Sequence, residues 1–236
     1  MRIGVVVGLR SEAACLSDPS IDDRRIVCCS GARPAEAARL AERLIDEGCD
    51  GLVSFGMAGG LDPVLAPGAL IVADSVLGAD GTALSTDTGW RQRLLARIRS
   101  NHLFSNRDHP EPVTGRVLAA VEPILSPRIK DYCHKTTQAI AVDMESGEVG
   151  RIAQAANRPF LVVRAVADAS TRSVPAWVIR TVTADGTTSL PAFLRGLARH
   201  PADVRLLYSL ARDSRAALRS LSGVALRVGP LFNLNG

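Results

Sequence analysis

Short apolar runs alternate with amphipathic stretches along this chain. Seven runs rich in β-branched residues predict buried strands: Ile3–Val7, Ile26–Cys29, Gly51–Phe55, Ala69–Ala73, Arg116–Ala120, Ile140–Val142 and Phe160–Val163. Helical patterns separate several of them, at Pro34–Glu47, Trp90–Ile98, Pro127–Cys133 and Gly147–Ala156. Strands that alternate with helices predict an α/β fold with a mixed, mostly parallel, twisted sheet flanked by helices.

The bulk properties bound the architecture. A chain of 236 residues that is 47% hydrophobic fills one large core, so we expect a single domain over residues 1–236. No apolar stretch reaches the roughly 18 residues of a membrane span. The first residues predict a strand rather than a signal peptide. Five cysteines without CxxC spacing favour reduced thiols in the cytoplasm and no zinc site. The polar stretch 100–112 predicts a surface loop.

The net charge of +4 lies in one basic amphipathic segment near the C-terminus, about residues 193–221, which holds six arginines against Asp203 and Asp213. Aromatic residues make up only 4% of the chain, which argues against a nucleic-acid partner. Two interpretations of the segment stay open. It is an interfacial helix that brings the protein to the inner face of the membrane, or a core-facing helix with solvated arginines.

Two carboxylates follow predicted strands. Glu145 comes just after Ile140–Val142, and Asp168 comes after Phe160–Val163. Taken alone, each is typical of a helix start or an N-cap. In an open α/β sheet, however, ligands bind beyond the carboxyl ends of the strands, where both residues fall. An acid for the leaving group and a carboxylate for a sugar are what cleavage of an N-glycosidic bond requires.

Glycine-rich backbone follows two strands, at Gly8 and in the run from Ser54 to Leu61. Glycines there allow backbone N–H groups to approach a ligand closely. The run is neither a P-loop nor a G-x-G-x-x-G motif, which argues against nucleoside triphosphates and dinucleotides.

Three segments carry a family resemblance: G-M-A-G-G-L-D-P at 56–63, A-V-D-M-E-S at 141–146 and R-A-V-A-D at 164–168. They resemble the purine nucleoside phosphorylase and methylthioadenosine nucleosidase superfamily. The resemblance implies that Glu145 holds the ribose hydroxyls, that Met144 packs on the sugar and that Asp168 protonates the base. It implies no metal or redox cofactor. The turn of Met57, Ala58 and Gly59 would lie with Gly8 under the ribose and the nucleophile.

The nucleophile stays open between water and phosphate. The segment after the first strand offers Glu12, which would activate water as nucleosidases do, and Arg10, which would bind phosphate as a co-substrate. Ser54 and Met57 stand where bacterial phosphorylases carry an arginine and a serine, so phosphate would be poorly neutralised. Residue by residue, water is favoured as the nucleophile.

Asp168 indicates the base. Its carboxyl group can donate to purine N7 while its other oxygen accepts from a 6-amino group, which favours adenine.

The segments V-A-D-A-S-T-R-S-V-P from Val166 and T-A-D-G-T-T-S-L-P from Thr183 resemble the hopanoid-associated phosphorylase subfamily. That resemblance implies cleavage of adenosylhopane, which releases adenine and leaves ribosylhopane with water or phosphoribosylhopane with phosphate. Trp177 and Val178 would then wall a hydrocarbon groove, and we expect a homo-oligomer. The alternatives are a nucleosidase for methylthioadenosine or 5′-deoxyadenosine, a non-catalytic purine-binding regulatory protein and a membrane-surface scaffold.

Overall fold

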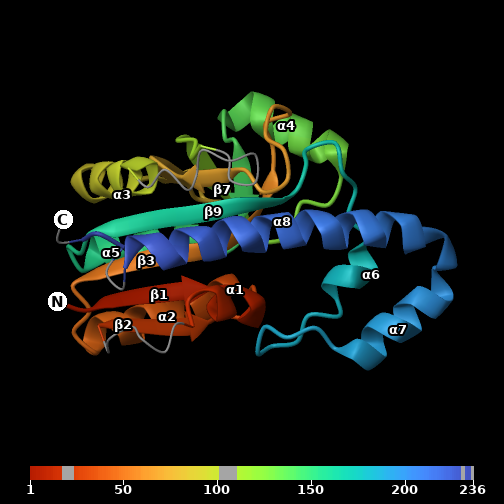
Figure 1. Cartoon of the computed structure of the whole chain (residues 1–236), viewed down its shortest axis with the longest axis horizontal. Coiled ribbons are helices and arrows are strands. Elements are labelled where there is room, and N and C mark those ends of the chain that lie inside the picture. The colour runs from red at the N-terminus through yellow and green to blue at the C-terminus, as the bar shows by residue number, and fades with distance from the viewer. Residues whose placement is uncertain (18–23, 101–110, 230–231, 235–236) are drawn as a thin grey trace.

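The predicted apolar runs lie together in one nine-stranded sheet (Figure 1). The computed structural model describes residues 1–17, 24–100, 111–229 and 232–234. Its strands are β1 (Ile3–Val7), β2 (Arg25–Cys29), β3 (Gly51–Gly60), β4 (Leu70–Val72), β5 (Ser75–Leu77), β6 (Ala83–Ser85), β7 (Arg116–Ala119), β8 (Ala141–Asp143) and β9 (Phe160–Asp168). All seven predicted strands are present, whereas the short strands β5 and β6 were not predicted.

The sheet is mixed, as expected. Its main path runs β2-β1-β3-β8-β7-β5-β6, and β9 pairs with β3 and β4. Strands β2, β1, β3 and β9 run parallel to one another, and β5, β7 and β8 form a second parallel group. The β3–β8, β4–β9 and β5–β6 pairs are antiparallel. The glycine-rich run at 56–60, expected as a turn, continues β3 as strand, with a register shift between Ala58 and Gly59.

Helices flank this sheet on both faces. They are α1 (Arg10–Cys15), α2 (Pro34–Asp46), α3 (Thr88–Ser100), α4 (Pro127–Thr137), α5 (Ser146–Ala155), α6 (Ala176–Ile179), α7 (Leu190–Arg199) and α8 (Val204–Val228). Buried residues of α3 and α8 share one apolar cluster with β3 and β9, and buried residues of α2 and α5 form a second cluster with the same strands. Because both faces of the central strands are covered, these strands read as continuous apolar runs. The predicted surface loop at 100–112 falls mostly on 101–110, outside the described residues.

The C-terminal segment is two helices rather than one. A 3₁₀ turn at Pro201–Asp203 separates α7 from α8. The second half of α8 packs on β9 through buried Leu221, Val224 and Val228, while its first half projects past the sheet beside α6 and α7 (Figure 1). The core-facing interpretation is therefore confirmed for the second half of α8, and the interfacial interpretation stays a prediction for the rest of the segment. Among the described helices, none is long and apolar enough to cross a bilayer.

Candidate active site

A cavity of about 220 Å³ lies at the carboxyl ends of four strands. Its polar floor comes from the residues that follow or end β1, β3, β8 and β9, and its wall is largely apolar. The lining residues are Gly8, Leu9, Glu12, Ala32, Met57, Ala58, Gly59, Glu122, Pro123, Ile124, Leu125, Val142, Asp143, Met144, Glu145, Ala167, Asp168, Val174 and Ile179. Glu12, Glu145 and Asp168 thus line one cavity, and the positions of Glu145 and Asp168 after strands predicted this for those two residues.

Glu12 is held as a buried hydrogen-bond acceptor in the first turn of α1. Its Oε2 accepts from the backbone N–H groups of Gly8 and Leu9, each at 2.8 Å, and its Oε1 accepts from that of Met57 at 2.8 Å. The first N–H groups of a helix lack partners within the helix, so a carboxylate at this position satisfies them. Burial raises the pKa of Glu12 against the lowering effect of Arg164. A raised pKa makes this carboxylate a stronger base near neutral pH.

Arg164 is the central cation of the site, and our sequence analysis did not single it out. It lies within β9 with a fully buried side chain. The guanidinium group forms ion pairs with Asp143 and with Glu145, the latter at 3.1 Å, and it donates to the Ser54 hydroxyl at 2.6 Å. Because the guanidinium presents its donors in a rigid fork, it fixes the positions of the carboxylates around it.

Glu145 is buried at the start of α5 and directs one oxygen to Arg164. Burial raises its pKa to about 7, the nearby Asp143 and Glu12 carboxylates add to this, and Arg164 opposes it. Within the described residues, Oε2 accepts from Arg164 and no hydrogen bond fills Oε1. That second oxygen, on a cavity-lining residue, is available to a ligand hydroxyl.

Two glycines let these charged side chains approach the strands. A Cβ atom at Gly8 would lie 2.8 Å from Oε1 of Glu145, and one at Gly56 would lie 2.7 Å from Nη1 of Arg164. Contacts that short do not occur, so a side chain at either position would displace the site. The glycines of this region serve packing between strand and side chain as well as access to a ligand.

Asp168 ends β9 and pairs with Lys130, a fully buried lysine of α4. The Lys130 ammonium group also donates to the backbone carbonyls of Ala169 and Arg172, each at 3.1 Å. All three of its donors therefore have partners. Burial raises the pKa of Asp168, and the adjacent Lys130 charge opposes that rise. Our sequence analysis placed Lys130 only on a predicted helix.

Some expected site residues lie elsewhere. Arg10 is mostly exposed and faces Asp185, with its Nε 3.5 Å from a carboxylate oxygen, and it is not a lining residue of the cavity. Trp177 and Val178 do not line it either; Val174 and Ile179 provide that wall. The Trp177 ring packs instead against Phe193 of α7, because α6 turns its indole toward that helix.

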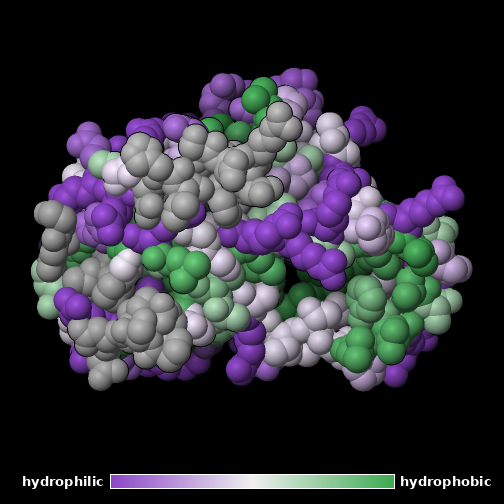
Figure 2. All heavy atoms as spheres, in the orientation of Figure 1, coloured by the Kyte–Doolittle hydropathy of each residue, from purple (hydrophilic) through white to green (hydrophobic). Residues whose placement is uncertain are grey.

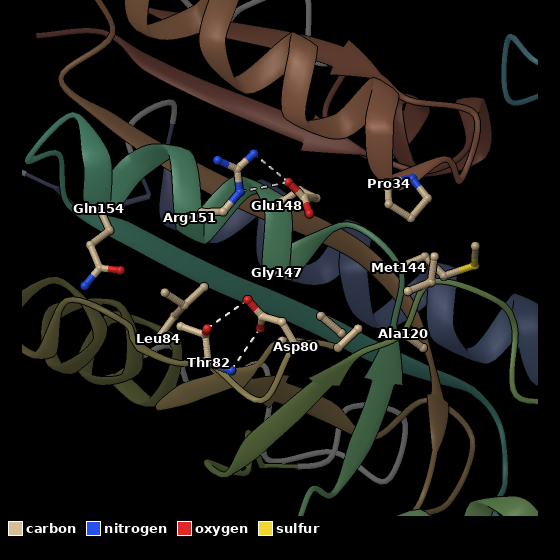
Figure 3. A pocket seen from close by; sticks show the side chains of 14 residues that line it. Pro34, Asp80, Thr82, Leu84, Ala120, Met144, Gly147, Glu148, Arg151 and Gln154 are labelled. Atoms are coloured by element: carbon tan, nitrogen blue, oxygen red, sulfur yellow. Dashed lines mark hydrogen bonds and ion pairs between the residues drawn. The ribbon is translucent and has the colours of Figure 1, made fainter.

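A second cavity of about 320 Å³ adjoins the first and shares Met144 with it (Figure 3). Its charged side chains are already paired locally. Arg151 donates to Glu148 at 2.8 Å, and Asp80 accepts from the Thr82 backbone at 2.9 Å. In the part of the chain that the structure describes, no group of three or more His, Cys, Asp or Glu side chains could hold a metal ion. The three candidate site carboxyl groups, Glu12, Glu145 and Asp168, line the first cavity and not this one.

Comparison with known proteins identifies the family of this chain. The family model of the phosphorylase superfamily matches residues 20–197. The chain belongs to the phosphorylase superfamily. It is accordingly an enzyme of the nucleoside phosphorylase and nucleosidase type, and the sequence resemblance at superfamily level is confirmed.

Solved structures share the phosphorylase superfamily fold with this chain. A 5′-methylthioadenosine/S-adenosylhomocysteine nucleosidase from Neisseria meningitidis superposes with a TM-score of 0.72 at 14% identity, over 96% of this chain and 97% of that one. An S-adenosylhomocysteine nucleosidase from Streptococcus pyogenes gives 0.69 at 16% identity, over 100% and 98%. The futalosine hydrolase of Helicobacter pylori gives 0.67 at 15% identity, over 95% and 97%.

Proposed function

We propose that this protein hydrolyses the N-glycosidic bond of a 5′-substituted adenosine and releases adenine. The observation that carries the proposal is the convergence of Glu12, Glu145 and Asp168 on one cavity, with Arg164 beneath them. Each carboxyl group has a different set of partners, so each suits a different role. The cavity therefore holds a candidate base, a candidate ribose ligand and a candidate acid, which are the three groups that this reaction needs.

The roles follow from the contacts. Asp168 donates a proton to purine N7 while the C1′–N9 bond breaks, and its second oxygen accepts from the 6-amino group. Glu145 accepts from the ribose hydroxyls through Oε1, since Arg164 occupies Oε2. A water molecule attacks C1′ and gives its proton to Glu12. The anionic groups also stabilise the positive charge that develops on the ribose in the transition state.

Water is favoured over phosphate by the charges of the cavity. Glu12 is fixed at the floor by three backbone N–H groups, and a phosphate dianion beside it would be repelled. Arg164 is already engaged with two carboxylates, and Arg10 faces Asp185. Phosphate would therefore find no free bidentate arginine at the floor of the cavity.

The substrate that we propose is adenosylhopane, with ribosylhopane as the second product. The sequence resemblance to the hopanoid-associated subfamily motivates it, and the apolar wall of the cavity supports it. Ile124, Leu125, Val174 and Ile179 line that wall, and hydrocarbon on the ribose 5′ carbon would be buried against such side chains. Ile179 belongs to α6, a helix that our sequence analysis did not predict.

A smaller nucleoside is the second candidate. Two of the structurally similar proteins are named as nucleosidases for methylthioadenosine or S-adenosylhomocysteine, and their folds match nearly the whole chain. Such a substrate needs only a small 5′ pocket. It would react through the same Glu12, Glu145 and Asp168 side chains, and it would leave part of the apolar wall without a contact.

The experiment measures adenine release from adenosylhopane in detergent, with and without phosphate, beside methylthioadenosine. We expect release from adenosylhopane without phosphate. Strict phosphate dependence would overturn the hydrolase assignment and make this a phosphorylase. Cleavage of methylthioadenosine alone would overturn the substrate and leave the chemistry intact. Binding of adenosine without turnover of either compound at any pH would favour a non-catalytic purine-binding protein.

A further inference from the structure

Helix α7 and the start of α8, which we name the C-terminal lobe, expose apolar side chains that no described residue covers. None of the ten residues of α7, all of them described, is buried. Leu190 and Leu194 lie one turn apart on this helix and are 64% and 54% exposed. Residues four positions apart share one face of a helix, so these leucines form a continuous apolar strip.

The first turns of α8 add exposed apolar side chains to the same lobe. Val204 and Tyr208, again four residues apart, are 52% and 73% exposed. Figure 2 shows hydrophobic side chains gathered over the lobe that α7 and the start of α8 form. We name Leu190, Leu194, Val204 and Tyr208 the apolar tip. Isolated exposed apolar residues are ordinary, but a contiguous group on one lobe indicates a binding surface.

Exposed arginines lie on the same two helices as the apolar tip, and among the described residues only Arg212 of these is paired with an acidic side chain. The six arginines of α7 and α8 up to Leu221 are all exposed: Arg195, Arg199, Arg205, Arg212, Arg215 and Arg219. The two acidic residues of that span are turned inward. Asp203 accepts from the Trp177 indole at 2.8 Å, and Asp213 is buried and accepts from Arg172 at 2.9 Å and Arg212 at 3.3 Å. The outward charge of the lobe is therefore strongly positive.

We propose that the apolar tip and its arginines dock on the surface of a bilayer that contains anionic lipids. Apolar side chains enter the boundary between headgroups and acyl chains, and arginines extend from the same helices to lipid phosphates. On α7, Arg195 and Arg199 follow Leu194 and Ala198 by one position, at the edge of the apolar strip. That is the arrangement of a helix that lies in the interface plane.

Two other partners fit this surface less well. A second copy of the chain placed tip to tip would bring two sets of arginines together without acidic partners, and such like-charge contact is unfavourable. A nucleic acid would match the charge but would leave Leu190, Leu194 and Val204 against a polar backbone. A lipid surface satisfies both halves of the patch.

Contacts of Trp177 connect the lobe to the helix that ends at the cavity wall. The Trp177 ring of α6 packs on Phe193 and stacks on His200, each with ring centroids 5.7 Å apart, and a Cβ at Gly196 would overlap it. The same short helix ends at Ile179, which lines the cavity. This step rests on the proposed function: if the substrate is a lipid, docking brings the apolar wall of the cavity close to the membrane that contains the substrate.

The test is co-sedimentation with phosphatidylcholine vesicles, with and without phosphatidylglycerol and without any nucleoside. We expect binding only to the anionic vesicles. The double substitution Leu194→Asp with Tyr208→Asp should lower the vesicle affinity about tenfold or more, because two side chains that would enter the bilayer are replaced by carboxylates. Arg205→Gln with Arg215→Gln should weaken it and reduce its salt dependence. The matched control is Leu226→Asp, since Leu226 is 73% exposed on the far part of α8 and should leave binding unchanged.

The outcomes separate this proposal from the proposed function. Thermal melting checks that each variant is folded, and turnover of a water-soluble adenosine derivative, which needs no membrane, should equal that of the parent protein. Absence of binding to anionic vesicles overturns the docking proposal, as does an equal loss in Leu226→Asp. A tip variant that changes the oligomeric state and not vesicle binding assigns the surface to a second copy and also overturns it. Vesicle binding without any turnover supports docking while the enzymatic proposal fails.

Discussion

Asp168 has two neighbours with opposite effects on its proton affinity. Burial raises its pKa, and Lys130 pulls it down. If Asp168 delivers the proton to the purine, then Asp168→Asn, which keeps the shape and removes the acid, should lower kcat about 10²- to 10⁴-fold. Steady-state adenine release measures this. The binding of adenine product, determined by calorimetry, serves as the control, and an unchanged kcat would exclude the assigned role.

Lys130 is a positioning residue for that acid. In Lys130→Met the opposing charge is gone, so the pKa of Asp168 should rise further. Activity that needs protonated Asp168 is lost as pH rises through that pKa, and the alkaline limb of kcat/KM should therefore move to higher pH. The pH profile of the variant beside that of the parent protein checks this. A uniform drop at every pH, with the limb in place, would mean that Lys130 only supports the backbone carbonyls of Ala169 and Arg172.

The sequence predicts those site residues that can be identified from their neighbours along the chain. Glu12, Glu145 and Asp168 follow apolar runs, and the carboxyl ends of strands meet at one edge of a sheet. Arg164 lies inside the run F-L-V-V-R-A-V-A-D, where an arginine flanked by apolar residues was a usable signal of a buried charge. Lys130 gave no such signal, because only the packing of α4 under the end of β9 buries it.

At the scale of elements, length predicts the helices and apolar composition predicts the strands. The long helices have enough residues to establish a period, and the seven apolar runs predicted as strands are all present. The elements α1, α6, β5 and β6 have three to six residues each, and unlike the equally short β4 and β8 they do not lie in one of these runs. The division of the basic segment into α7 and α8 follows Pro201, which suits the first position of the 3₁₀ turn. An apolar wall was predicted at this segment, but the side chain that faces the cavity is Ile179 rather than Trp177 or Val178, because α6 sets their orientation and was not predicted.

Trp177 connects α6 to α7 and the 3₁₀ turn, so Trp177→Ala should loosen the lobe without unfolding the sheet. The variant loses the ring contacts with Phe193 and His200 and the indole hydrogen bond to Asp203. We expect faster hydrogen exchange over residues 190–203, while exchange in β3 and β9 stays slow. Exchange followed by mass spectrometry checks it. Uniformly faster exchange in the sheet as well would mean that the lobe and the core unfold as one unit.

At the scale of the whole molecule, the active site is a group of charges inside the sheet. Asp143, Glu145 and Arg164 are all buried, and Glu12 lies beside them. Three carboxyl groups share one guanidinium, so the folded protein favours a proton on one of them. The arrangement suits a cationic transition state and costs stability when the site is empty and fully ionised. Stability and catalysis are thus coupled through the same side chains.

This coupling gives a prediction for stability against pH. The pKa of Glu145 is raised from 4.5 to about 7. The folded state therefore holds the proton more tightly than the unfolded state, so this contribution to stability is complete below pH 4.5 and is lost as pH rises to about 7. The loss is on the order of 3 kcal/mol. In Glu145→Gln the titrating group is absent, so the variant should gain stability relative to the parent protein across that pH range.

Urea unfolding at a series of pH values measures the difference. Glu12 has a raised pKa from burial and also raises the pKa of Glu145, so the difference between the two proteins reports Glu145 together with its coupling to Glu12. Glu148→Gln is the matched control, because Glu148 is a more exposed glutamate of α5 paired with Arg151. A difference between parent and Glu145→Gln that stays constant between pH 4.5 and about 7 would show that the pKa of Glu145 is not raised in the folded protein. In that case Arg164 offsets the burial of Glu145, and the ribose clamp is charged across that range.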